Sequence, residues 1–222
     1  MAARHCCRTL VADATPTTTL VPSDAQLLGG DGVITQGTQL ANIDIPLDYE
    51  VGLDITPTTS LESGWGSIVH FTATGANCCN YGDRIPGVWF WPNTRKLLVV
   101  DGHTADGNSH TDGWGCDDSV LTLEPDVNYR LRMVFTQYSV SVYVNDQVAC
   151  DNIPRVDRQV WPNTLVYVGD PWHAPAQASV QNLYFKPLGA LFGRGLGGCS
   201  VRQGVWFLGV LIFDSFVVKL RA

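Results

Sequence analysis

Charged residues are scarce in this chain. They make up 16% of its 222 residues, whereas soluble domains usually have about 25%. Runs of Ala, Glu, Lys and Leu, which favour helices, are also few, and Thr, Asn, Ser and Gly fill the polar positions instead. This composition argues against a mostly helical protein and favours short strands joined by turns.

Positive charge is the scarcer of the two signs. The 14 Lys and Arg residues against 21 Asp and Glu residues give a formal net charge of −7 at pH 7. Such a surface does not neutralise phosphates, so we expect no nucleic acid among the partners. A cation or a neutral, hydroxyl-rich ligand fits an anionic protein better.

No two cysteines have the C-x-x-C spacing of a zinc knuckle or a thioredoxin-like redox site. Seven cysteines are present, and the odd number leaves at least one thiol in the tails unpaired. The four central cysteines predict two disulfides, and hence an oxidising compartment; they are Cys78, Cys79, Cys116 and Cys150. Because adjacent cysteines do not easily bridge each other, we expect Cys78 and Cys79 each to reach Cys116 or Cys150, in either pairing.

A recognisable export signal is also missing. Only Leu10, Val11 and Ala12 follow the basic residues near the N-terminus, whereas a signal peptide needs about 7–15 apolar residues there. The predicted disulfides nevertheless point to an extracellular or cell-surface protein. We therefore expect either a fragment of a larger secreted protein or a true start further upstream.

Short strands at regular intervals fill the middle of the chain. Residues 48–56 and 127–136 show the alternation of apolar and polar side chains that is typical of a half-buried strand. Further strands are expected at 32–36, 39–45, 66–73, 87–91, 96–100, 139–145, 147–150, 163–169 and 178–186. The absence of a convincing helix indicates an all-β sandwich or barrel. The side chains that we expect to be buried between two sheets are Tyr49, Val51, Leu53, Leu131, Met133, Phe135, Val142 and Leu183.

The two ends differ from this block. Residues 1–27 are a Thr/Pro-rich N-terminal tail, residues 28–187 hold the expected sandwich, and residues 188–222 form a Gly-rich linker and an apolar C-terminal tail. The apolar stretch at 205–218 is shorter than the roughly 20 residues of a membrane span and contains Asp214. A membrane contact, a docking segment and a gene-model error all remain open for it.

Two segments carry a resemblance to a known superfamily. They are residues 66–92, GSIVHFTATGANCCNYGDRIPGVWFWP, and residues 164–187, TLVYVGDPWHAPAQASVQNLYFKP. With the VSVYVND turn at 140–146, they resemble concanavalin A-like lectin/glucanase domains of the laminin-G-like sort, in which a strand ending in Y-x-x-D-P-W leads to the closing strand x-x-N-L-x-F. The resemblance covers about residues 28–187 and implies a two-sheet antiparallel jelly-roll sandwich with flexible tails. It leaves the function open, because the superfamily includes lectins, adhesion modules, glycosidases and structural domains.

The sequence lacks the carboxylate motif of the enzymes that share this fold. Laminarinase-type glucanases carry E-x-D-x-x-E on one strand, because retaining hydrolysis needs two carboxyl groups about 5 Å apart. The nearest match, Glu124-Pro125-Asp126, lacks the final acid, and its proline marks a turn. No serine elbow and no paired His/Cys arrangement occurs either. We therefore expect a non-catalytic binding or adhesion module for glycans or a protein surface; the alternatives are a glycoside hydrolase or lyase of the same fold and a structural domain of a larger cell-surface protein.

The loop at 101–118 is the most unusual stretch of the sequence. It is rich in glycine and in oxygen ligands, of which calcium takes about six to eight; the predicted ligands are Asp101, Asp106, Asn108 and Asp112. The spacing is not that of an EF-hand, since Thr111 stands where the central glycine is required. Asp/Gly clusters are also ordinary turn chemistry, so a calcium site and a solvated hairpin tip both remain open.

Aromatic and charged side chains supply the other candidates for a ligand site. Flat aromatic faces beside a few polar groups are typical of sugar binding. Trp91 and Trp114 border turns and are the indoles that we expect to face a ligand. Asp83 and Arg84 follow the cysteine pair, and they form either an ion pair within the loop or a site for a ligand's carboxylate or sulfate.

Overall fold

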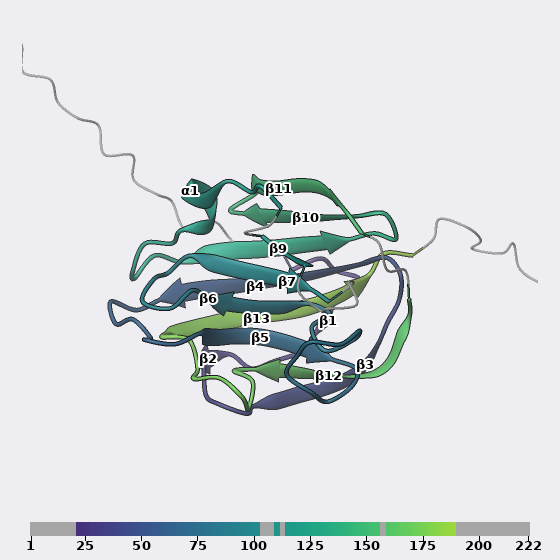
Figure 1. Cartoon of the computed structure of the whole chain (residues 1–222), viewed down its shortest axis with the longest axis horizontal. Helices are drawn as coiled ribbons and strands as arrows, with labels where there is room; N and C mark the ends of the chain where they lie inside the picture. The colour runs from purple at the N-terminus through teal and green to yellow at the C-terminus, as the bar shows by residue number, and fades with distance from the viewer. Residues whose placement is uncertain (1–20, 103–108, 112–113, 156–158, 190–222) are drawn as a thin grey trace, which may run out of the picture. The chain divides into compact units, whose positions relative to one another are not determined.

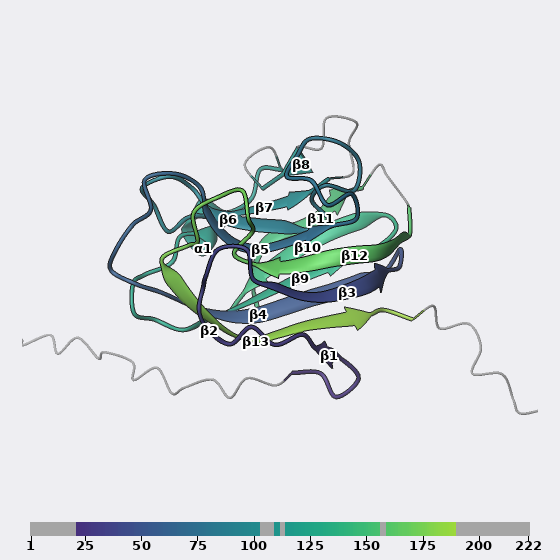
Figure 2. The same cartoon turned by 90° about the horizontal axis from the view of Figure 1, so that it is seen from below.

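The computed structural model describes residues 21–102, 109–111, 114–155 and 159–189, which form two facing antiparallel β-sheets (Figure 1). Figure 2 shows the two layers from below. The predicted all-β, two-sheet antiparallel sandwich is confirmed. Within these ranges no helix is both long and apolar enough to cross a bilayer. The stretch at 205–218 lies outside the described residues, so its predicted membrane contact stays a prediction.

The first sheet has seven strands. Six follow the order β1-β13-β4-β9-β10-β11, and β2 also pairs with β13. The strands are β1 (Gln26–Leu27), β2 (Gly32–Val33), β4 (Tyr49–Pro57), β9 (Tyr129–Phe135), β10 (Ser139–Val144), β11 (Gln147–Pro154) and β13 (Ala178–Pro187). Because β1 pairs with β13, the paired region begins before residue 28, the predicted start of the sandwich.

The second sheet has six strands in the order β3-β12-β5-β6-β7-β8. They are β3 (Gln39–Ile45), β5 (Gly66–Thr72), β6 (Gly87–Phe90), β7 (Leu97–Asp101), β8 (Ser109–His110) and β12 (Trp161–Val168). The one helix of the described residues, α1 (Asp118–Leu121), is a single turn that the sequence pattern did not predict. The Asp117 carboxylate caps it by accepting a hydrogen bond from the Ser119 backbone N–H at 2.9 Å.

The hydrophobic core lies between the two sheets, because each strand turns alternate side chains inward. Val51 faces Met133 and Leu53 faces Leu131 across the β4–β9 pair. All eight side chains that were predicted to be buried are at most 1% exposed, which confirms that prediction. The strands with the clearest alternation therefore have the predicted register.

A buried ion pair connects the two sheets. Arg155, which follows β11, donates from Nε to the carboxylate of Asp101 at the end of β7, at 2.7 Å. Both residues are buried. The same guanidinium donates to the carbonyl oxygens of Leu47 at 3.2 Å and Thr136 at 2.9 Å. Asp101 ends β7, Leu47 lies between β3 and β4, and Thr136 lies between β9 and β10. Arg155 therefore holds three other chain segments together at this end of the sandwich.

The disulfide pairing differs from the prediction. Cys116 bridges Cys150, with Cα atoms 4.7 Å apart, and Cys78 bridges its neighbour Cys79. The expectation that both adjacent cysteines bond to the other two was wrong. The reason is position: the segment before α1 runs beside β11 of the first sheet, where the Asp117 N–H donates to the Ala149 carbonyl at 2.8 Å. Cys78 and Cys79 lie in the β5–β6 connection of the other sheet.

We predict unequal effects of removing the two disulfides. The Cys116–Cys150 bond joins residues 34 positions apart, so the double variant Cys116→Ala/Cys150→Ala should lose about 2–4 kcal/mol of unfolding free energy. Cys78→Ala/Cys79→Ala is the matched control and should lose much less, since a bond between neighbours barely restricts the unfolded chain. Urea unfolding of both variants measures the difference, and equal losses would contradict the prediction.

Candidate functional site

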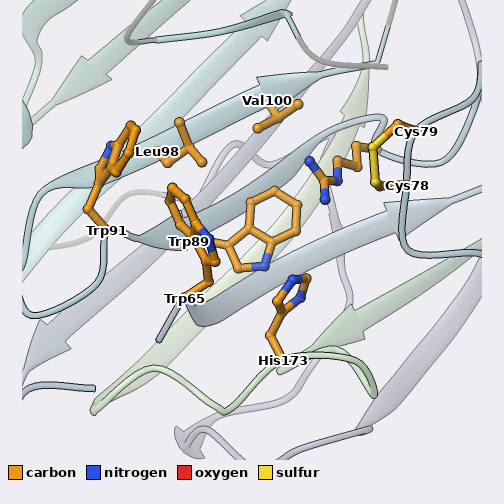
Figure 3. A pocket seen from close by; sticks show the side chains of 9 residues that line it. Trp65, Cys78, Cys79, Trp89, Trp91, Leu98, Val100 and His173 are labelled. Carbon is orange, nitrogen blue, oxygen red and sulfur yellow. A yellow bond between two sulfur atoms is a disulfide. The ribbon is translucent and has the colours of Figure 1, made fainter. Parts of the chain in front are cut away.

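A pocket of about 300 Å³ lies on the outer face of the six-stranded sheet (Figure 3). Trp89 on β6 and Leu98 and Val100 on β7 form its floor, because they alternate with side chains that enter the main core. The connections around the sheet supply the walls. These are Trp65 before β5, Trp91 after β6, Cys78, Cys79 and Arg84 between β5 and β6, and His173 between β12 and β13.

The floor depends on a glycine. The Trp89 ring lies so close to the backbone of Gly87 that a Cβ at position 87 would overlap it. Trp89 is consequently only 2% exposed although it points away from the core. At one end of the pocket the half-buried rings of Trp65 and Trp91 lie 4.6 Å apart, inclined by 48°. The three indoles thus form a continuous aromatic surface.

A buried carboxylate fixes the floor and one wall. Asp170 follows β12 and is 0% exposed. Its Oδ2 accepts hydrogen bonds from Trp89 Nε1 at 3.1 Å and His173 Nδ1 at 2.9 Å. It also accepts from Ser67 Oγ at 2.9 Å and His70 Nδ1 at 3.1 Å on β5. The position of each ring is therefore set by the same anion.

The other oxygen of Asp170 shapes the turn that carries His173. Oδ1 accepts from the backbone N–H groups of Trp172 at 2.9 Å and His173 at 2.8 Å. Burial alone would raise the pKa of the Asp170 carboxyl, but the hydrogen bonds and charges of His173 and His70 outweigh it and hold this pKa far below its usual range. Asp170 stays ionised, so it acts as an acceptor for all of these donors.

The β5–β6 connection is organised around Asp83. Its carboxylate accepts from the Asn80 N–H at 2.8 Å and from the Thr74 hydroxyl, and its carbonyl oxygen contacts His70 Nε2 at 2.6 Å. Arg84, the next residue, donates from Nε to the Asn77 carbonyl at 3.0 Å and lies 5.0 Å from the centre of the Trp89 ring. Burial lowers the pKa of its guanidinium, although Asp170 and Asp83 oppose that effect.

Of the predicted ligand-binding residues, the structure brings two together. Trp91 and Arg84 both line the pocket. Asp83 is 0% exposed, with its carboxylate turned into its own loop. Trp114 is half-buried and packs against the main core between the sheets, apart from the pocket residues.

Of the predicted calcium ligands, only Asp101 belongs to the described residues, and its carboxylate accepts from Arg155. Asp106, Asn108 and Asp112 lie outside them. The described part of the chain contains no group of three or more His, Cys, Asp or Glu side chains placed to hold a metal. Calcium binding by this loop remains a prediction.

Several pocket residues were not singled out from the sequence. Trp89 belongs to the same expected strand as Trp91, residues 87–91, but it does not border a turn and was assigned no ligand role. His173 and Asp170 stand in the quoted D-P-W-H turn, which gives no sign that Asp170 reaches Trp89, 81 positions away. Leu98 and Val100 look like any buried strand residues.

Ser67, His70 and Asp170 have the residue types of a catalytic triad but a different arrangement. Ser67 Oγ donates to Asp170, and the second nitrogen of His70 contacts the Asp83 carbonyl. All three side chains are fully buried. The serine hydroxyl therefore has no base to activate it, and a substrate has no access to it.

We predict that Asp170→Asn destabilises the domain by about 3–5 kcal/mol, because it leaves buried donors facing an amide instead of an anion. The control is Asp24→Asn, because an ion pair as exposed as that between Asp24 and Lys186 contributes little to stability. Asp170 has a lower pKa folded than the roughly 3.9 of an unfolded chain, so its contribution is present above that pH and declines as the pH falls. Thermal unfolding between pH 7 and 3 should therefore show a smaller loss of stability in the variant; parallel curves would contradict this.

No protein-family model matches the chain, and no curated protein matches its sequence. Among solved structures, the chain is similar to domain 4 of AbnA, an extracellular arabinanase from Geobacillus stearothermophilus in complex with arabinotriose (15% identity, 69% of each chain covered, TM-score 0.46). Another is human galectin-16 (12% identity, 70% of this chain and 98% of the other, TM-score 0.47). A third is the carbohydrate-binding module CBM66 from Bacillus subtilis (13% identity, 73% and 95%, TM-score 0.41). The strand pairing shows a two-sheet antiparallel sandwich. The concanavalin A-like superfamily that residues 66–92 and 164–187 resemble stays a prediction.

Proposed function

We propose that this protein is a non-catalytic extracellular module that binds a glycan in the pocket on the outer face of the six-stranded sheet. The observation that supports this most directly is the convergence of Trp65, Trp89 and Trp91 on one pocket. Sugar rings present C–H faces that pack on indoles, and hydroxyls that need a few fixed polar partners. Arg84 and His173 are the polar side chains placed to provide them.

The lining of the pocket favours binding without turnover. Hydrolysis of a glycosidic bond requires two carboxyl groups that face the sugar. Among the described residues that line this pocket there is neither Asp nor Glu. The Asp170 carboxylate lies beneath the floor with both oxygens engaged. A glycosidase of the same fold is therefore the weaker alternative.

The two disulfides support an extracellular or cell-surface location, because such bonds persist in oxidising compartments. Binding of a protein surface is the alternative within the same function class. It would use a wider contact area than this pocket offers, since stable protein interfaces bury on the order of 800 Å² on each partner.

We predict that Trp91→Ala and Trp65→Ala each weaken glycan binding at least about tenfold, since buried Trp side chains dominate binding energies. The screen is a glycan array with the wild-type protein, followed by calorimetry with the strongest ligand. Trp172→Ala is the matched control, because this indole is 37% exposed and does not line the pocket.

Two results would overturn the proposal. One is that no glycan on the array binds the wild-type protein. The other is that Trp172→Ala weakens binding as much as the two pocket variants do. Release of shorter sugars from the bound glycan would instead favour the glycosidase alternative.

A further inference from the structure

The polar groups of the pocket are few for a sugar in which nearly every ring carbon carries a hydroxyl. Its floor consists of Trp89, Leu98 and Val100. The indole N–H of Trp89 is already donated to Asp170, so the floor side chains offer a ligand no hydrogen bond. A hydroxyl placed against this floor would lose its hydrogen bonds to water without replacement.

The polar side chains stand at the edges of the pocket. Figure 3 shows His173 below Trp89, while Leu98 and Val100 lie above it. Arg84 lines the pocket from the β5–β6 connection. Leu98 and Val100 alternate along β7 and present their apolar side chains next to each other. A ligand that fits this arrangement has an apolar group on one side and hydrogen-bonding groups on the other.

We propose that the site selects a sugar that carries an acetamido group, with the acetyl methyl packed on Leu98, which at 7% is more exposed than Val100 at 1%. This inference rests on the proposed function and specifies its ligand class. The acetamido group combines a methyl with an amide, so the methyl can bury against β7 while the amide oxygen accepts hydrogen bonds from donors at the edge, such as a guanidinium. A hydroxyl or an ammonium at the same carbon would be desolvated against apolar side chains.

The guanidinium of Arg84 alone does not make this a site for anions. It stacks over the Trp89 ring and is held by the Asn77 carbonyl. Two carboxylates, those of Asp83 and Asp170, lie close enough to act on its charge. An acidic substituent on the sugar is therefore not required, and the apolar floor remains the feature that discriminates between ligands.

The test compares trisaccharides that differ only in the substituent at C2. Chitotriose carries acetamido groups, cellotriose hydroxyls and the glucosamine trimer ammonium groups; N-acetylgalactosamine and galactose oligomers form a second series. Calorimetry on the wild-type protein should show the acetamido member of at least one series binding about tenfold or more tightly than its hydroxyl analogue, the discrimination that one apolar group gives in a hydrophobic pocket.

The floor itself is tested by Leu98→Asn, which keeps the approximate size of the side chain and replaces its two methyl groups with an amide. The acetamido preference should fall towards parity in this variant. Leu27→Asn is the matched control, because Leu27 on β1 is 60% exposed and belongs to the other sheet, and it should keep the full preference.

A second measurement does not depend on the variant folding. In saturation-transfer NMR with wild-type protein, the acetyl methyl protons should receive the strongest signal of the ligand. Equal affinity for acetamido and hydroxyl sugars, or saturation concentrated on ring protons, would overturn the selectivity. If array glycans without acetamido groups bind and the acetamido probes do not, only this inference fails; if no glycan binds, the proposed function fails as well.

Discussion

The Asp170 carboxylate lies fully buried beneath the outer face of the six-stranded sheet, and donors from three parts of the chain point at it. Ser67 and His70 come from β5, Trp89 from β6 and His173 from the connection to β13. A buried anion is tolerated only where such donors surround it. Its hydrogen bond and the close packing on Gly87 together fix the orientation of the Trp89 indole. The shape of the pocket therefore depends on one ion as much as on apolar contact.

The outer face of the seven-stranded sheet has a different chemistry. Glu50 on β4 accepts a hydrogen bond from the Tyr184 hydroxyl at 2.7 Å, and Arg132 contacts the same carboxylate at 3.4 Å. Burial and the neighbouring Glu50 raise the pKa of Tyr184. The ring of Tyr184 lies over Gly52, much as Trp89 lies over Gly87. The charged groups on this face pair with each other, whereas the outer face of the six-stranded sheet has an aromatic pocket. This difference favours the six-stranded sheet as the ligand-binding face.

How far the sequence predicts this structure depends on the range of the interactions. Strands such as 48–56 and 127–136 were predicted because alternation is a local property, and the buried set that includes Met133 and Phe135 followed from it. The disulfide pairing was mispredicted because it depends on which loops the two sheets bring together. Trp91 and Arg84, two of the predicted ligand-binding residues, line the pocket, while Trp114 packs on the core; their ligand roles stay predictions. The role of Asp170 was not predicted, since its partners Trp89, His70 and Ser67 lie 81 to 103 positions away in the sequence.

The Cys116–Cys150 bond also lies at an edge of the first sheet. Among the described residues, β11 is the last strand of its sheet, and no strand of that part of the chain pairs with its outer side. The segment before α1 runs along this strand, where the Asp117 N–H donates to the Ala149 carbonyl and the disulfide holds the segment in place. An uncovered strand edge is a template for pairing with another molecule. The bridge therefore helps to keep this edge covered, and in a reducing environment the segment would be held there without its covalent link.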